Sequence, residues 1–103
     1  MHQLGTSIRL DAIHDDDSET CIVDIPSWNF AWQQAYFFSD DTELLLGRHD
    51  TLRLTCTFDN SAANQPVVNG VQQEPHDVHW GETTSDEMCL VYLDVRVPVL
   101  TFR

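Results

Sequence analysis

The sequence contains no lysine. Its five basic residues are all arginine, against 17 aspartates and glutamates, and the formal net charge is −12. Nucleic-acid binding needs a basic surface that neutralises phosphate groups, and anionic membranes attract polybasic segments. The composition therefore predicts that neither a nucleic acid nor a membrane surface is a partner. The excess of acidic residues favours solubility.

Long apolar runs are also missing, and no stretch approaches the roughly 20 residues that a membrane-spanning helix needs. No secretory signal sequence is visible. The opening residues, MHQLGTSIRL, already have the character of a strand, so we expect the chain to be an excerpt of a longer protein. A length of 103 residues with 42% hydrophobic content predicts one globular domain, residues 1–103.

Cysteines are few, and none lies in a Cys-x-x-Cys pair or at a Cys/His spacing typical of zinc sites. The three are Cys21, Cys56 and Cys89. One disulfide and one odd cysteine is the simplest arrangement, and it implies an oxidising compartment. We therefore predict a secreted or periplasmic location.

Helical periodicity is absent as well, and apolar residues alternate with polar ones at a period of two. Six to eight short strands without a helix predict an all-β fold, either a β-sandwich or a jelly roll, in a single domain. We expect the segment 59–75, rich in Asn, Gln and Pro, to be the longest loop, and Pro98 to mark an edge or a strand end. The expected strands are SIRLDAI (7–13), ETCIVDI (19–25), WNFAWQQAYFF (28–38), TELLLG (42–47), LRLTCTF (52–58) and MCLVYLDVRVPV (88–99).

The alternation places Cys56 and Cys89 on the core-facing sides of their expected strands. Two inward cysteines on different strands can form a cross-sheet disulfide if their Cα atoms lie within about 7 Å. A bridge closing a loop of this length stabilises by roughly 4 kcal/mol in the chain-entropy model. The same alternation turns Met88 to the opposite, outward face.

An outward methionine usually packs under a loop or at an interface. The functional alternative is a metal ligand, because a thioether is a soft donor that favours Cu(I), and imidazoles suit the same metal. Neither a His-x-His pair nor a His-Glu-x-x-His motif is present. The chain offers five histidines, namely His2, His14, His49, His76 and His79.

Several motifs together carry a family resemblance. WGETTSDEMC resembles the signature near the end of the copper type II ascorbate-dependent monooxygenases, which include peptidylglycine α-hydroxylating monooxygenase and dopamine β-monooxygenase. WNFAWQQAYFF is similar to the aromatic strand of that family, and LLLGRHDTLRLTCTFDNS to its glycine turn and core strand. The order and separation of these elements also agree over roughly residues 2 to 93. The chain is most similar to bacterial members.

This resemblance implies the C-terminal catalytic domain of the family, an antiparallel jelly-roll β-sandwich. Its copper is held by two histidines and by the Met of the EMC element, which implies Met88 as the thioether ligand. MHQLG looks like the end of the histidine motif, so His2 is the implied second histidine and the first is expected just before Met1. The family also pairs the cysteines that match Cys56 and Cys89.

The alternation places His2 on the inward side with Leu4, Ile8 and Leu10, unless Gly5 marks a bulge that changes the facing. Tyr92 shares the face of Met88, and the matching Tyr of the peptide-amidating members contacts the substrate carboxylate. The neighbouring substrate-contacting positions hold Leu90 and Asp94 here, which departs from those members.

The resemblance implies hydroxylation of a C–H bond of a small-molecule or peptide substrate with dioxygen. Electrons come from ascorbate through a second copper in an upstream histidine-rich domain, so the isolated chain is expected to lack complete turnover. The alternative, from another class, is a metal-free structural or ligand-binding β-sandwich of a secreted protein.

Other residues suggest weaker sites. Asp86 and Glu87 can act as an acid or base, but a turn that presents Met88 is favoured. The acidic run after His14 lacks an EF-hand pattern, so a solvated turn is favoured over calcium. His76 and His79 are expected in an exposed loop. A carbohydrate platform of Trp28, Phe30, Trp32 and Tyr36 competes with ordinary core packing.

Overall fold

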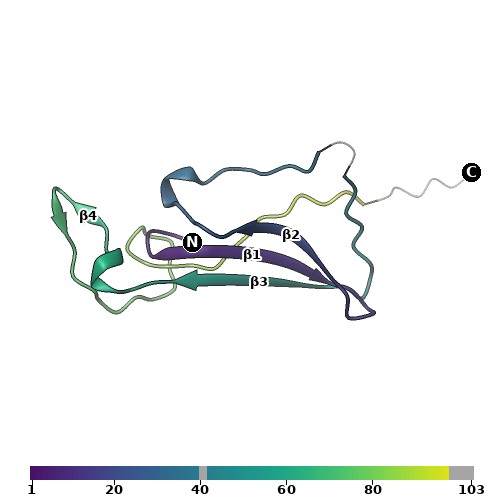
Figure 1. Cartoon of the computed structure of the whole chain (residues 1–103), viewed down its shortest axis with the longest axis horizontal. Coiled ribbons are helices and arrows are strands. Elements are labelled where there is room, and N and C mark those ends of the chain that lie inside the picture. The colour runs from purple at the N-terminus through teal and green to yellow at the C-terminus, as the bar shows by residue number, and fades with distance from the viewer. Residues whose placement is uncertain (40–41, 98–103) are drawn as a thin grey trace, which may run out of the picture.

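The main sheet has three antiparallel strands, β1 (Gly5–Ile13), β2 (Glu19–Ile25) and β3 (Thr51–Phe58), in the order β2-β1-β3 (Figure 1). The computed structural model describes residues 1–39 and 42–97. The strands expected at 7–13, 19–25 and 52–58 are therefore confirmed. A tight turn after His14, with a positive φ of 66° at Asp17, joins β1 to β2.

The core lies on one face of the central strand β1. Ile8, Leu10 and Ala12 alternate with polar residues and are 7%, 1% and 0% exposed. Met1 and Leu4 extend this buried row at the start of the chain. The pairing of β1 with β3 shifts register between Gly5 and Ser7, so the ladder is irregular at the place where Gly5 suggested a bulge.

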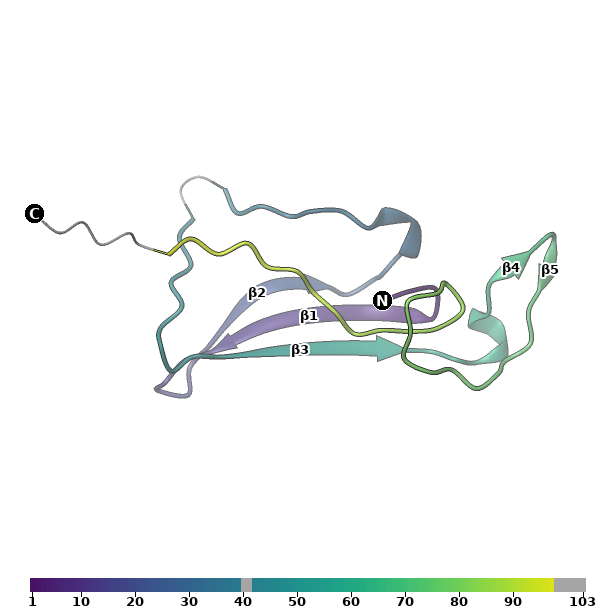
Figure 2. The same cartoon turned by 180° about the vertical axis from the view of Figure 1, so that it is seen from behind.

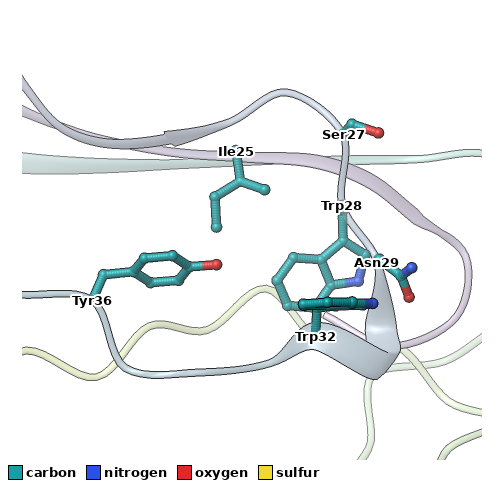
Figure 3. Close-up of a pocket in the computed structure, with 6 residues that line it drawn as sticks. All are labelled: Ile25, Ser27, Trp28, Asn29, Trp32 and Tyr36. Carbon is teal, nitrogen blue, oxygen red and sulfur yellow. The ribbon is translucent and has the colours of Figure 1, made fainter.

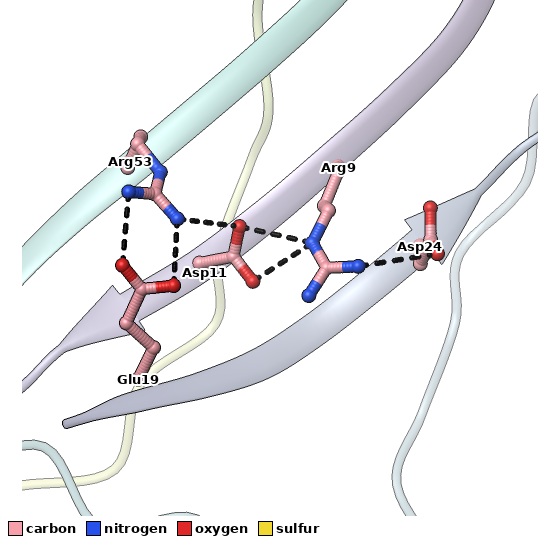
Figure 4. A network of polar contacts seen from close by, with 5 residues as sticks. All are labelled: Arg9, Asp11, Glu19, Asp24 and Arg53. Carbon is pink, nitrogen blue, oxygen red and sulfur yellow. Dashed lines mark hydrogen bonds and ion pairs between the residues drawn. The ribbon is translucent and has the colours of Figure 1, made fainter.

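The opposite face of the sheet carries a network of ion pairs (Figure 4). Asp11 of β1 is only 2% exposed and accepts hydrogen bonds from Arg9 Nε (2.9 Å) and from Arg53 Nη2 of β3 (3.3 Å). Arg53 also binds both carboxylate oxygens of Glu19 on β2, at 3.0 and 2.9 Å. Arg9 reaches Asp24 at 3.4 Å. These side chains therefore connect all three strands across one face.

The segment 59–75 is more ordered than the loop we expected. It contains a 3₁₀ turn, η2 (Ala62–Asn64), and a hairpin of β4 (Val67–Val68) and β5 (Val71–Gln72). Asn69 and Gly70 connect the two strands with φ values of 51° and 79°. Asn-Gly is the preferred pair for such a two-residue hairpin turn, because both positions need positive φ.

Two expected strands are wrong. Within 28–38 the chain forms only a 3₁₀ turn, η1 (Phe30–Trp32), because the Asn29 side chain accepts the Ala31 amide at 3.0 Å and so competes with extended structure. The described residues of 42–47 form no strand either. Here the chain enters a turn in which the Gly47 amide donates to Asp50 Oδ2 at 2.7 Å.

The last expected strand, 88–99, is also wrong over its described part. Residues 88–97 form no ladder, and Figures 1 and 2 show them running past the main sheet. Alternating apolar residues make a strand only where a neighbouring chain supplies hydrogen-bond partners. Pro98 and the expected end of this strand lie outside the described residues.

The described residues are all-β, with five strands and two 3₁₀ turns and no α-helix. They form no second large sheet, so the jelly-roll sandwich stays a prediction. Several large apolar side chains of these residues are strongly exposed, including Phe37 (84%), Leu45 (72%) and Val97 (76%). In the described part of the chain, no helix is long and apolar enough to cross a membrane.

Candidate functional site

His2 is buried at the edge of the core and is 9% exposed, so it stays on the inward side even though the register shifts after Gly5. Its Nδ1 lies 2.7 Å from the main-chain oxygen of Asp86. A carbonyl oxygen only accepts hydrogen bonds, so Nδ1 carries the proton and Nε2 of the neutral ring keeps a free lone pair. This is the arrangement that metal-binding histidines use, with one ring nitrogen oriented by an acceptor and the other left for the metal.

Glu87 holds the main chain around His2. Its carboxylate accepts the main-chain N–H of His2 at 2.7 Å through Oε2 and that of Leu4 at 2.8 Å through Oε1. The side chain is 9% exposed, and both bonds are buried. The two residues that precede Met88 therefore both bind the start of the chain.

The segment that carries Met88 has its own internal turn. The Asp86 amide donates to the Thr83 carbonyl at 3.0 Å, and the Asp86 carboxylate accepts the Thr83 hydroxyl at 2.7 Å. The Glu87 amide donates to the His79 carbonyl, and the Glu87 carbonyl accepts the Gly81 amide, both at 3.1 Å. The structure thus shows Asp86 in the turn that the sequence favoured.

A disulfide fixes the residue after Met88. Cys89 is bonded to Cys56 of β3, with Cα atoms 5.8 Å apart, so the predicted bridge is confirmed. Cys56 lies opposite Ile8 of β1 in the sheet register. Met88 is half-buried between two anchored neighbours, one tied to the start of the chain and one tied to the sheet.

Two aromatic residues also contact His2. Trp28 donates from its indole N–H to the His2 carbonyl at 3.0 Å, and Phe30 meets the imidazole edge-on with ring centroids 5.8 Å apart. Trp28 also contributes to an open depression of about 310 Å³. Figure 3 shows the Tyr36 hydroxyl pointing toward the indoles in this depression. It is lined by Ile25, Ser27, Trp28, Asn29, Trp32 and Tyr36.

The donors near this site fit a copper ion in chemical type. His2 presents a free imidazole nitrogen, and Met88 presents a soft thioether; Cu(I) favours both. No group of three or more His, Cys, Asp or Glu that could hold a metal is found among residues 1–39 and 42–97. Two donors, His2 and Met88, are linked in the described residues, because Asp86 and Glu87, directly before Met88, both bind His2.

The side chains of the remaining candidates are exposed or make other contacts. Tyr92 is 90% exposed, and His49, His76 and His79 are exposed too. His14 is held between Asp50 (Nδ1, 2.9 Å) and the Thr20 hydroxyl (Nε2, 2.7 Å), so it has a structural role. Cys21 is free and exposed.

The sequence did not reveal the contacts of Glu87 with His2 and Leu4. A carboxylate in a turn-like run is usually exposed, and partners 85 and 83 residues away have no local signal. The only available hint was the position of Glu87 directly before the implied ligand Met88.

Comparison with known proteins gives one family. Residues 1–95 match the family model for the copper type II ascorbate-dependent monooxygenase, C-terminal domain. No curated protein and no solved structure matches the chain. The match includes both His2 and Met88 and covers nearly the whole sequence, and the chain therefore belongs to the C-terminal domain family of the copper type II ascorbate-dependent monooxygenases.

Proposed function

We propose that His2 and Met88 are two protein ligands of a catalytic copper, and that a histidine from outside these 103 residues completes the set. The observation that carries this proposal is the hydrogen bond from His2 Nδ1 to the carbonyl of Asp86, two residues before Met88. It orients the imidazole and leaves Nε2 free, while it ties the ring to the segment of the thioether.

The copper would supply the redox chemistry by which dioxygen hydroxylates a substrate C–H bond. This chain holds and orients its donors. Asp86 fixes the tautomer of His2, and the Cys56–Cys89 disulfide anchors the chain directly after Met88. Trp28 holds the His2 carbonyl and Phe30 packs edge-on against the His2 ring.

The same proposal includes the rest of the enzyme. An upstream histidine-rich domain would carry the second copper and pass on electrons from ascorbate, so the isolated chain would not complete turnover. That domain would also cover apolar side chains that are exposed in this chain, which would form a jelly-roll sandwich. The disulfide supports a secreted or periplasmic location.

The substrate would be a small molecule or a peptide. Tyr92 is a candidate contact, and its exposed ring is available to a ligand or to a partner domain. The prediction for this residue rests on its place four residues after Met88 in the family motif.

Titration with Cu(I) tests the ligands, using a chain that is extended upstream of Met1. We expect Met88→Ile to weaken Cu(I) binding and to remove the sulfur contribution from the X-ray absorption spectrum. Leu90→Ile, a nearby apolar variant, is the control and should behave like the unmodified chain. Equal affinity and equal sulfur coordination in the Met88→Ile protein would remove Met88 from the site.

The second candidate function is ligand binding without a metal. The depression beside Trp28, with Trp32 71% and Tyr36 56% exposed, has the aromatic surface on which sugar rings stack. This candidate predicts that oligosaccharides perturb tryptophan fluorescence equally with and without a copper chelator. Absence of any such response in the wild type would exclude it, whereas a response that is lost in Trp32→Ala would support it.

A further inference from the structure

We propose that Glu87 is the positioning residue of the copper site, because its carboxylate fixes the His2 backbone beside the Met88 segment. The inference rests on the proposed function for its link to copper. We call the two hydrogen bonds from the His2 and Leu4 amides to the Glu87 carboxylate the clamp. The clamp belongs to the metal-free chain and is tested there separately.

Both oxygens of the carboxylate are used. Oε2 accepts the His2 amide at 2.7 Å and Oε1 accepts the Leu4 amide at 2.8 Å. Residues 3 and 4 form a turn before β1 begins, and in this turn the amides of both His2 and Leu4 reach the one planar carboxylate. These charge-assisted bonds are short and are buried from competing water.

The main chain of Glu87 is held as firmly as its side chain. Its amide donates to His79 and its carbonyl accepts the Gly81 amide. Glu87 is therefore fixed at three places, while the next residue carries the thioether. A displacement of the clamp would change the placement of His2 relative to Met88.

Only a glutamate meets these geometric demands. A glutamine would offer one oxygen acceptor, and its NH₂ group would face the second amide as another donor. An aspartate is shorter by one methylene group. A buried amide without an acceptor is unfavourable, so Glu87→Gln should release either His2 or Leu4.

The test compares Glu87→Gln and Glu87→Asp with Glu82→Gln, which removes one exposed acidic charge from the same loop. In the metal-free chain, the Leu4 amide should exchange its hydrogen at least about tenfold faster in both Glu87 variants. The ¹⁵N signals of the His2 ring should move away from those of a ring protonated at Nδ1. Glu82→Gln should match wild type in both measurements.

The loaded protein gives the second readout. Replacing a residue that orients a ligand typically costs roughly 10- to 100-fold in metal affinity, and we expect this loss for Cu(I) in Glu87→Gln. The imidazole contribution to the copper X-ray absorption spectrum should fall, because the carboxylate that holds His2 is lost. The Glu87→Asp variant should lie between Glu87→Gln and wild type.

Unchanged Leu4 exchange and an unchanged His2 ring in Glu87→Gln would overturn the clamp. A loss of both features in Glu82→Gln as well would also overturn it, because the effect would then be one of charge alone. Failure of wild type to bind Cu(I) through sulfur would instead overturn the proposed function, and the metal-free measurements would still decide the clamp.

Discussion

The main-chain oxygen of Asp86 accepts a hydrogen bond from Nδ1 of His2 at 2.7 Å. We therefore expect neutral His2 to be the tautomer that is protonated at Nδ1, whereas free histidine favours protonation at Nε2. Long-range ¹H–¹⁵N correlation spectra of the metal-free chain measure this directly. His76, which is exposed, serves as the internal control. A His2 ring protonated at Nε2 would contradict the arrangement that leaves this atom for copper.

The Cys56–Cys89 disulfide closes a loop with a sequence separation of 33 residues. Replacing both cysteines by alanine should lower the free energy of unfolding by roughly 4 kcal/mol, because the unfolded chain regains loop entropy. Urea denaturation measures the loss. Cys21→Ala, at a free and exposed position, should change stability little. Equal stability of the double variant and wild type would show that the bridge adds nothing.

Gly81 leaves no room for a side chain. A Cβ atom there would overlap the Asp86 carboxylate and would lie 2.9 Å from Asp86 Cβ. We expect Gly81→Ala to cost roughly 1–3 kcal/mol, as other overpacked positions do. Thermal unfolding measures this change. Adding Asp86→Ala should recover part of the loss, since the overlapping carboxylate is then absent; no recovery would mean that the backbone, not the clash, is at fault.

The buried Asp11 should matter more than its exposed counterpart Asp24. Asp11 accepts charge-assisted bonds from Arg9 and Arg53, and each such bond contributes about 1.5–3 kcal/mol. Asp11→Ala should therefore lower the free energy of unfolding by roughly 2 kcal/mol or more. Asp24→Ala removes only an exposed 3.4 Å pair and should cost under about 1 kcal/mol. Similar losses in urea denaturation would refute this ranking.

The carboxylate of Asp50 should contribute to the free energy of unfolding in a way that acid removes. The Gly47 amide, and next the His14 imidazole, lower the pKa of this carboxyl below its ordinary value of 3.8. A lowered pKa in the folded state means that the contribution is complete above 3.8 and is lost as the pH falls through the folded-state pKa. Asp50→Asn should be less stable than wild type at pH 7 and should lose less on acidification.

The free energy of unfolding, measured between about pH 2 and 7 by denaturant titration, tests this slope. Asp77→Asn makes the same substitution at an exposed position and should follow the wild-type curve. Parallel curves for Asp50→Asn and wild type would contradict the prediction.

The sequence predicted the three strands of the main sheet because their alternation coincides with real neighbours. β1 pairs on both edges, so Ile8, Leu10 and Ala12 are buried as their pattern indicated. Residues 28–38 and 88–97 alternate as clearly, yet neither has a partner strand in the described structure. Periodicity reports which side chains share a face, but it does not supply the hydrogen-bond partner.

The candidate site shows the same limit. Met88, His2 and the cysteine pair followed from motifs and from the facing of side chains. The contacts of Asp86 and Glu87 with His2 did not, because they depend on how a late turn folds back onto the first residues. The Asn69–Gly70 hairpin is different, because its dipeptide alone indicates a two-residue hairpin turn. We expected a loop there because the surrounding residues are mostly polar.

Glu87 and His2 are 85 positions apart, whereas β1 and β2 are joined by a tight turn. Closing so long a loop costs more chain entropy than forming the hairpin, and contacts of high sequence separation slow folding. We therefore expect the nascent hairpin to form early on the ribosome and the donor atoms to meet only after the last third of the chain has been synthesised. Copper binding would then have to wait until the residues around Met88 have been synthesised and have folded back onto the first residues.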